Sequence, residues 1–137
     1  MSDKTLTLDH LCSVHLDIGT PTFLQNGPLG SKVIAPITGG TFAGERVQGT
    51  IVANSGADWV SIGPNGEMRL DVRFTMLTHD GASIYVSYNG VLANGRALSA
   101  PLFETGDERY TWLNSVQGVG AGSASAGSVD YEFYVLA

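Results

Sequence analysis

Hydrophobic and polar residues alternate along three long stretches of the chain. Residues 6–18 carry apolar side chains at every second position, apart from a break in the alternation at His10 and Leu11. The same alternation runs through residues 68–76 and 129–135. A period of two places one set of side chains on each face of an extended strand, so we predict β-strands in these three segments.

Shorter strands are predicted from apolar runs between turn-forming residues, at residues 33–37, 46–53, 57–62, 83–89, 96–99 and 110–116. The dipeptides that favour two-residue hairpin turns are Asn65-Gly66, Asp80-Gly81, Asn89-Gly90 and Asn94-Gly95. A short helical turn is expected at residues 106–110, with Thr105 as its cap. Eight to ten short strands joined by hairpins predict an all-β fold. We favour an up-and-down, closed antiparallel barrel, because closure removes exposed strand edges.

One segment has low complexity. Residues 118–127 contain mostly glycine, alanine and serine. No strand–helix unit surrounds this segment and no lysine follows it, so it lacks the context of a phosphate-binding loop. We predict a flexible hairpin loop here.

Composition narrows the class of protein. The 137 residues suit one domain, residues 1–137, and the 18 glycines suit many tight turns. A net charge of −6 argues against nucleic-acid binding and against anionic membrane surfaces. The N-terminus lacks a secretory signal pattern, and we expect a cytoplasmic protein. Cys12 is the only cysteine, so no internal disulfide forms, and its apolar register predicts a buried, inert thiol.

Six motifs occur in order between Pro36 and Asn114. They occupy residues 36–44, 56–59, 70–75, 80–86, 101–106 and 110–114. In this pattern the chain resembles the small uncharacterised family DUF3237, also called UPF0311. The resemblance implies a small β-barrel of lipocalin-like appearance that is often oligomeric, so we expect a homo-oligomer. It implies little about the reaction.

Three residues are candidates for catalysis. Asp58 precedes Trp59, and a carboxylate next to an indole has its pKa raised by desolvation, which suits a general acid or base. Glu104 is a candidate for the second carboxylate of an acid/base pair. Arg73 is a candidate for stabilising an oxyanion. The other interpretation is structural: Asp58 forms a turn, and Glu104 caps the backbone or pairs with Arg109.

Asp71 and Arg73 are two residues apart on a predicted strand and therefore project from the same face. If Leu70, Val72 and Phe74 pack inward, this ion pair lies outside the barrel and contributes little. If the barrel interior is polar instead, Asp71 contacts substrate and Arg73 is a preorganised cation.

Aromatic residues provide candidate walls for a planar or cyclic ligand. Core packing is the competing interpretation for each of them. Tyr110, Trp112 and Asn114 share a face if residues 110–116 form a strand. The predicted substrate-binding residues are Trp59, Asp71, Tyr88, Tyr110, Trp112 and Asn114.

The three histidines do not predict a metal site. His10 and His15 are separated by an odd number of residues, so a regular strand sends them to opposite faces. His15 and Asp17 share a face, but two ligands are too few. We predict neither a metal nor a cofactor.

Three functions fit the sequence. The first is a cofactor-independent acid/base enzyme, of isomerase, cyclase or lyase type, acting on a small cyclic or aromatic carbonyl or phenolic compound in the barrel. The second is a barrel that binds a small hydrophobic ligand without changing it. The third is a structural protein with a filled barrel. We favour the first, because polar groups are interleaved with aromatic residues beyond the needs of packing.

Overall fold

The computed structural model describes residues 4–137, which fold into eleven strands and one short helix. The elements are β1 (Leu8–Ile18), β2 (Thr22–Gly27), β3 (Gly30–Ala43), β4 (Gln48–Ile51), β5 (Gly56–Ile62), β6 (Met68–Thr78), β7 (Ser83–Ala93), β8 (Arg96–Ser99), β9 (Leu102–Glu104), the 3-10 helix η1 (Glu108–Ser115), β10 (Gly118–Ser125) and β11 (Ser128–Leu136). Within these residues, no helix is long and apolar enough to span a membrane.

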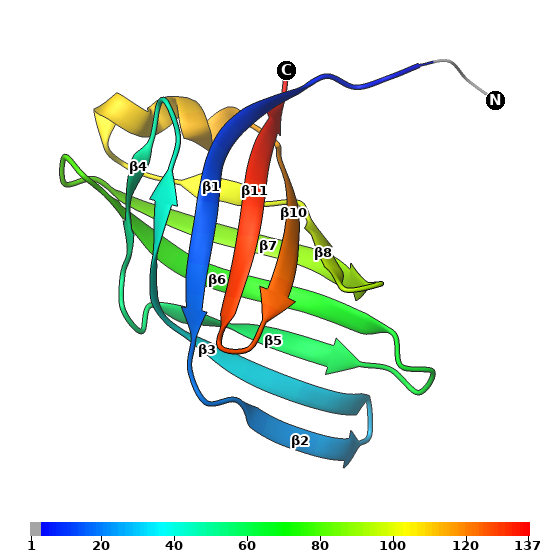
Figure 1. Cartoon of the computed structure of the whole chain (residues 1–137). Coiled ribbons are helices and arrows are strands. Elements are labelled where there is room, and N and C mark those ends of the chain that lie inside the picture. Colours follow the sequence, from blue (N-terminus) through cyan, green and yellow to red (C-terminus); the bar gives the residue numbers. More distant parts are fainter. Residues whose placement is uncertain (1–3) are drawn as a thin grey trace.

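Eight of these strands form a closed antiparallel barrel. Their order around the barrel is β1, β3, β5, β6, β7, β8, β10 and β11, and β11 then pairs with β1 (Figure 1). Neighbours around the barrel therefore follow one another along the chain. The predicted closed, up-and-down architecture is confirmed. Three short strands add to it: β4 bridges β3 and β6, β9 pairs with β7, and β2 pairs with β3.

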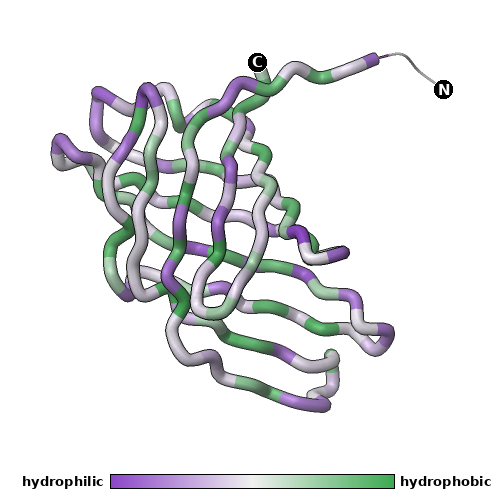
Figure 2. The backbone as a smooth tube through the Cα atoms, in the orientation of Figure 1, coloured by the Kyte–Doolittle hydropathy of each residue, from purple (hydrophilic) through white to green (hydrophobic). Residues whose placement is uncertain are grey.

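Alternation along the strands separates a buried interior from the outer surface. Figure 2 shows hydrophobic and hydrophilic positions following one another along the barrel strands. On β6 the inward residues are almost fully buried, including Val72, Phe74 and Met76. Burial of this apolar surface is the main force that holds the barrel together. The predicted burial of the Cys12 thiol is also confirmed, and burial raises its pKa to about 12.

Aromatic rings fill the centre of the barrel. Tyr88 packs edge-to-face on Tyr131, with ring centroids 5.6 Å apart, and on Phe133 at 5.8 Å. Phe74 and Phe103 extend the cluster through Tyr88 and Phe133 respectively. Helix η1 lies at the end of the barrel opposite the β10–β11 turn, and its Tyr110 and Leu113 are buried in the core (Figure 1).

The prediction of a strand at residues 110–116 is wrong, because this segment forms most of η1. Its buried residues, Tyr110 and Leu113, are three positions apart, which is the spacing of a helix. Asp107 caps the helix by accepting a hydrogen bond from Arg109 N–H, so the expected cap at Thr105 lies two residues too early. The shared face expected for Tyr110, Trp112 and Asn114 therefore does not exist.

The glycine-rich segment is also different from our expectation. Residues 118–125 form β10, a full member of the barrel, instead of a flexible loop. Its inward positions are Gly118, Gly120 and Gly122, and the rings of Phe133 and Tyr131 pack against the last two. Glycine is needed there because the rings occupy the space that side chains on β10 would take.

Three of the four predicted hairpin turns are present. Asn65-Gly66, Asp80-Gly81 and Asn94-Gly95 lie between consecutive strands, and their glycines have φ values of +83°, +94° and +76°. Asn89-Gly90 instead lies inside β7. A Cβ at Gly90 would collide with the Leu98 carbonyl oxygen, so this glycine permits close approach between β7 and β8.

His10 and His15 lie on the same face, contrary to the expectation for a regular strand. The pairing of β1 with β11 shifts by one residue between His10 and Cys12. This bulge accounts for the break in alternation at Leu11, and it turns both histidines toward carboxylates of β11. His10 Nε2 lies 2.8 Å from Glu132, and His15 Nδ1 lies 2.6 Å from Asp130.

The packing of Tyr131 against β10 predicts that Gly122→Ala destabilises the fold. The added Cβ would lie 2.6 Å from Tyr131 Cδ1 and 2.7 Å from the Asp130 carbonyl oxygen. We expect urea denaturation to show a loss of about 1–3 kcal/mol in the free energy of unfolding. Ala121→Val, whose side chain faces outward on the same strand, should change it by less than about 0.5 kcal/mol. Equal stability of the two variants would contradict this role of Gly122.

Candidate functional site

Asp58 is a carboxylate on the inner face of the barrel. On β5 it lies opposite Val72 of β6 and Ala35 of β3, and Val72 is a buried core residue. Paired residues on neighbouring strands share a face, so Asp58 points into the barrel, as Val72 does. Trp59 therefore points outward. The side chains of Asp58 and Trp59 take opposite faces, as a regular strand predicts.

A local gap in the β5–β6 pairing fixes the Asp58 side chain. The strands pair at Asp58↔Val72 and again at Ser61↔Arg69. Between these points the Asp71 N–H donates a hydrogen bond to Asp58 Oδ1 at 3.2 Å. Within residues 4–137, Asp58 Oδ2 accepts no hydrogen bond. One carboxylate oxygen is thus anchored and the other is free to exchange a proton.

Burial raises the pKa of Asp58 from 3.8 to about 6. The hydrogen bond from Asp71 N–H lowers this pKa, and the negative charge of Asp71 raises it. The desolvation that we expected from Trp59 comes instead from the barrel interior. A carboxyl group with a pKa near 6 exchanges protons readily near neutral pH.

Two tyrosines face Asp58 across the interior. Burial raises the pKa of Tyr131 to about 12 and holds that of Tyr88 well above its ordinary value, and the charge of Asp58 adds to both shifts. Both hydroxyls therefore stay protonated and are available as hydrogen-bond donors. The buried Tyr88 hydroxyl has the Tyr131 hydroxyl as its polar neighbour, and the interaction between the two raises the pKa of Tyr88 and lowers that of Tyr131. Sequence reasoning singled out Tyr88 but missed Tyr131, although Tyr131 occupies an inward position of a strand predicted from its alternation.

The interior is less tightly covered around Asp58 than around the aromatic cluster. The inward residues beside and below it are half-buried and apolar; they include Val33, Ala35, Val60 and Ile62. These residues lie toward the end of the barrel away from η1. Asp58 is therefore bordered on this side by a half-buried apolar surface.

Arg73 lies on the outer face of the barrel. Its guanidinium is 4.8 Å from the centre of the Trp59 ring and 3.3 Å from the Asp71 carboxylate, and half of its side chain is exposed. Asp71 and Arg73 share a face as predicted, and Leu70, Val72 and Phe74 pack inward. The structure does not bring Arg73 and Trp59 together with the Asp58 carboxylate.

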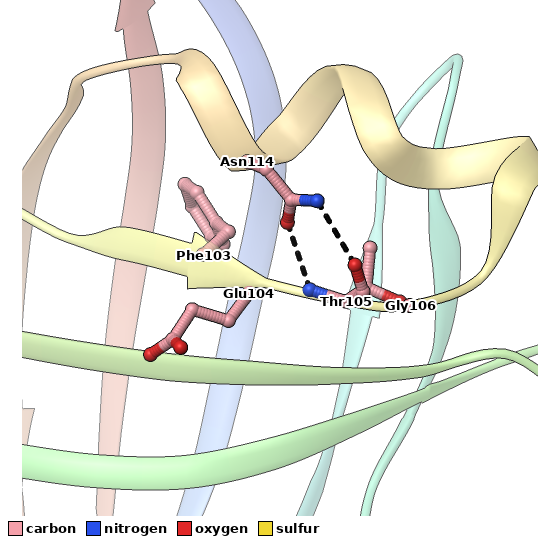
Figure 3. A pocket seen from close by; sticks show the side chains of 5 residues that line it. All are labelled: Phe103, Glu104, Thr105, Gly106 and Asn114. Carbon is pink, nitrogen blue, oxygen red and sulfur yellow. Dashed lines mark hydrogen bonds between the residues drawn. The ribbon is translucent and has the colours of Figure 1, made fainter.

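Glu104 and Asn114 lie at a second place, beside helix η1. A shallow cavity there is lined by Phe103, Glu104, Thr105, Gly106 and Asn114. Figure 3 shows the Asn114 amide turned toward Thr105, whereas the Glu104 carboxylate points away. Asn114 Oδ1 accepts from Thr105 N–H at 2.8 Å, and its Nδ2 donates to the Thr105 carbonyl at 2.9 Å. This amide fastens η1 to β9.

Tyr110 and Trp112 have contacts that hold η1 in place. The Tyr110 hydroxyl donates to the Asp80 carboxylate at 2.9 Å, which links the helix to the β6–β7 turn. Trp112 is covered by Arg46, whose guanidinium lies 3.6 Å from the ring centre. Of the nine residues predicted for the site, the barrel interior brings together only Asp58 and Tyr88.

Metal ligands are not grouped in the part of the chain that the structure describes. Residues 4–137 contain no cluster of three or more His, Cys, Asp or Glu side chains arranged to hold an ion. The two histidine–carboxylate groups on β1 and β11 are exposed. The hydrogen bond with Asp130, the largest cause, raises the pKa of His15.

A family model extends the resemblance seen in the motifs. The model of DUF3237, a family described as proteins of unknown function, matches residues 6–136. This chain belongs to the DUF3237 family.

Relatives of this DUF3237 protein include one with a named activity. The hydroalkoxylation enzyme phnH of Penicillium herquei is 30% identical over 109 residues, which cover 80% of this chain and 69% of phnH. A UPF0311 protein of Rhodopseudomonas palustris is 29% identical over 91% of this chain and 93% of its own length.

Solved structures share the fold over almost the whole length. A protein of unknown function from R. palustris superimposes with a TM-score of 0.90 at 27% identity, covering 98% of this DUF3237 chain and 99% of that protein. An enzyme from P. herquei superimposes with a TM-score of 0.81 at 28% identity, covering 100% and 99%.

The raised pKa of Asp58 predicts how stability depends on pH. Between pH 4 and 6 the unfolded chain releases the Asp58 proton while the folded chain retains it, so stability falls as pH rises. Above about pH 7 the destabilisation is constant at about 3 kcal/mol. Asp58→Asn keeps the acceptor for Asp71 N–H and removes the titration. In urea denaturation, the stability of this variant relative to wild type should rise by about 2 kcal/mol between pH 4 and 7.5. If the difference in stability between the variant and the wild type does not change with pH, the pKa of Asp58 in the folded protein is the ordinary one.

The contacts of Asn114 predict a structural effect of its removal. Asn114→Ala loses both hydrogen bonds to Thr105 and should lower the free energy of unfolding by about 1–2 kcal/mol. Glu104 lies on the adjoining strand with its carboxylate turned away. Glu104→Ala should therefore change the free energy of unfolding by less than about 0.5 kcal/mol. Thermal and urea denaturation measure both variants. If Asn114→Ala were as stable as Glu104→Ala, the amide would not be fastening the helix.

Proposed function

We propose that this protein is an acid/base enzyme that adds a hydroxyl O–H across an activated C=C bond of a small cyclic or aromatic carbonyl or phenolic compound. The observation that carries the proposal is the anchored, inward-facing Asp58 carboxylate with a pKa of about 6. Its apolar surroundings suit an organic substrate, and its free oxygen suits proton transfer.

The proposed reaction needs one proton carrier. Above pH 6 Asp58 is ionised, and its Oδ2 accepts the proton of the substrate hydroxyl as the new C–O bond forms. The π-electrons of the C=C bond then move toward a conjugated carbonyl. Protonated Asp58 returns the proton to the carbon at the other end of the former double bond. Atoms and charge balance, and the substrate undergoes no net oxidation or reduction.

Tyr131 and Tyr88 supply the proposed electrostatic stabilisation. Charge develops on the carbonyl oxygen during the addition, and two neutral hydroxyls placed beforehand are suitable donors to it. The raised pKa values keep both tyrosines protonated through the neutral range. A substrate oxygen would accept from Tyr131, whose hydroxyl lies next to that of Tyr88.

The relative phnH supports the choice among acid/base reactions. Its activity is named as hydroalkoxylation, which is the addition of an alcohol O–H across a C=C bond. The same groups operating in reverse would perform elimination, so a lyase is the neighbouring alternative. The tightly packed aromatic cluster limits the reaction to the part of the interior near Asp58.

A panel of hydroxylated compounds carrying a conjugated C=C bond tests the proposal, with the change in substrate absorbance as the readout. Asp58→Asn should lower kcat/KM by about 10²–10⁴-fold while the protein stays folded, because the proton carrier is lost. Wild-type kcat/KM should rise with pH to a plateau above about 6. Tyr131→Phe should lower kcat by about 10–100-fold.

Asp9→Asn is a matched control, because Asp9 is an exposed aspartate near the start of β1. It should retain the wild-type rate and pH profile. A folded, fully active Asp58→Asn protein would contradict the proposal. A loss of kcat in Arg73→Gln equal to that in Asp58→Asn would instead support the three-residue site expected from the sequence. Tight binding without turnover across the panel would indicate a ligand-binding barrel.

A further inference from the structure

Strand β2 presents an unusual amount of apolar surface to solvent. All six of its residues are exposed, and within residues 4–137 it pairs with β3 alone. Phe23 is 62% and Leu24 52% exposed, so two large apolar side chains lie next to each other at the surface. Figure 1 shows the β2–β3 hairpin extending past the β10–β11 turn, at the end of the barrel away from η1.

The strand register connects Phe23 to the Asp58 site. Phe23 lies opposite Val33 of β3, and Val33 lies opposite Val60 of β5. Residues paired in this way share a face, so these three side chains form one row on the inner face. Asp58 is two residues from Val60 on the same strand and therefore belongs to the same face. A continuous inner surface leads from the carboxylate to the exposed phenyl ring.

This surface is apolar and hollowed at its outer part. A cavity of about 230 Å³ at the edge of the hairpin is lined by the apolar residues Phe23, Leu24, Val33 and Ile62 and by the polar residues Gln25, Asn26, Ser31 and Lys32. The neighbouring inward residues Met68 and Leu92 are half-buried and apolar. The Asp58 carboxylate and the two tyrosine hydroxyls lie deeper. A ligand that fits this gradient has an oxygen-bearing end and a hydrocarbon body.

We infer that the β2–β3 hairpin is the outer wall of the substrate site, with Phe23 as the residue that contacts the hydrocarbon part of an amphipathic substrate. This inference rests on the proposed function and names the substrate class: a hydroxylated or carbonyl-bearing ring that carries an apolar chain. The oxygen-bearing end reaches Asp58, and the chain lies over Val60, Val33 and Phe23.

An exposed leucine on another strand provides an internal control. Leu102 lies on β9, where it pairs with Ser87 of β7, and β9 contacts η1. Leu102 is 50% exposed, which is comparable to the exposure of Phe23. It lies off the row of side chains that leads from Phe23 to Asp58 and does not line the cavity beside the hairpin.

A series of 4-alkylphenols with saturated chains of increasing length tests the inference without requiring turnover. Calorimetric titration of the wild-type protein should show affinity rising by about two- to fourfold for each added methylene group. Phe23→Ala should remove this increase for the outer methylenes and weaken binding of the longest phenol by about tenfold. Phe23→Leu should restore part of the affinity, and Leu102→Ala should bind as the wild type does.

The outcomes separate this inference from the proposed function. Chain-length-dependent binding that requires Phe23 supports the inference even if no compound is turned over, in which case the proposed function fails. Turnover that requires Asp58 but is indifferent to Phe23→Ala overturns the inference alone. Equal effects of Phe23→Ala and Leu102→Ala overturn it as well. Sedimentation of the Phe23→Ala variant gives a further check, because dissociation of an assembly would assign the ring to contacts between copies.

Discussion

The interior of the barrel is governed by the fit between aromatic rings and glycines. Phe133 packs where β10 has Gly120, and Tyr131 packs where it has Gly122. Eight strands enclose a volume that side chains can just fill, so each ring needs a neighbouring position with no side chain. This fit fills the part of the interior next to β10 and β11 with rings, up to Tyr88. On the other side of Asp58 the inward positions of β3 and β5 carry the smaller residues Val33, Ala35 and Val60, which are half-buried.

The position of Asp58 shows how a barrel tolerates a charge on its inner face. An isolated ionised carboxylate in an apolar interior is strongly unfavourable, and a hydrogen bond offsets part of this cost. The interrupted pairing of β5 and β6 provides that bond from Asp71 N–H. The same backbone group would have lacked a partner without Asp58. The defect in the sheet and the buried carboxylate therefore compensate each other.

The long strands were predictable because burial of one face leaves a clear alternation, as in β6 and β11. Strand β10 was not, since its inward glycines carry no hydrophobic signal even though they recur at every second position. Helix η1 was mistaken for a strand, because its two buried residues at a spacing of three are too few to display a helical period. Asp58 was found from its place beside Trp59, yet the burial that raises its pKa comes from the opposite face.

The sequence predicted that Arg73 and Glu104 lie near Asp58. Local sequence does not encode which residues of distant strands come together in the folded barrel. Alternation correctly placed Asp71 and Arg73 on one face, but it does not state which face encloses the site. Tyr131 reaches Asp58 only because β11 and β5 lie across the interior from each other, and more than seventy residues separate the two side chains along the chain.

Closure between β1 and β11 has a consequence for how the molecule is made. Leu8 pairs with Leu136, and Ser13 with Glu132, so the first and last strands form one ladder. Contacts between residues so distant along the chain slow folding, because a large loop must close before they form. During synthesis, β1 has to wait for β11 to leave the ribosome. Until then the inward face of β1, which includes Cys12 and Leu16, is exposed and can associate with other chains. Aggregation of the nascent chain is therefore most favoured during this interval, and a chaperone would act then.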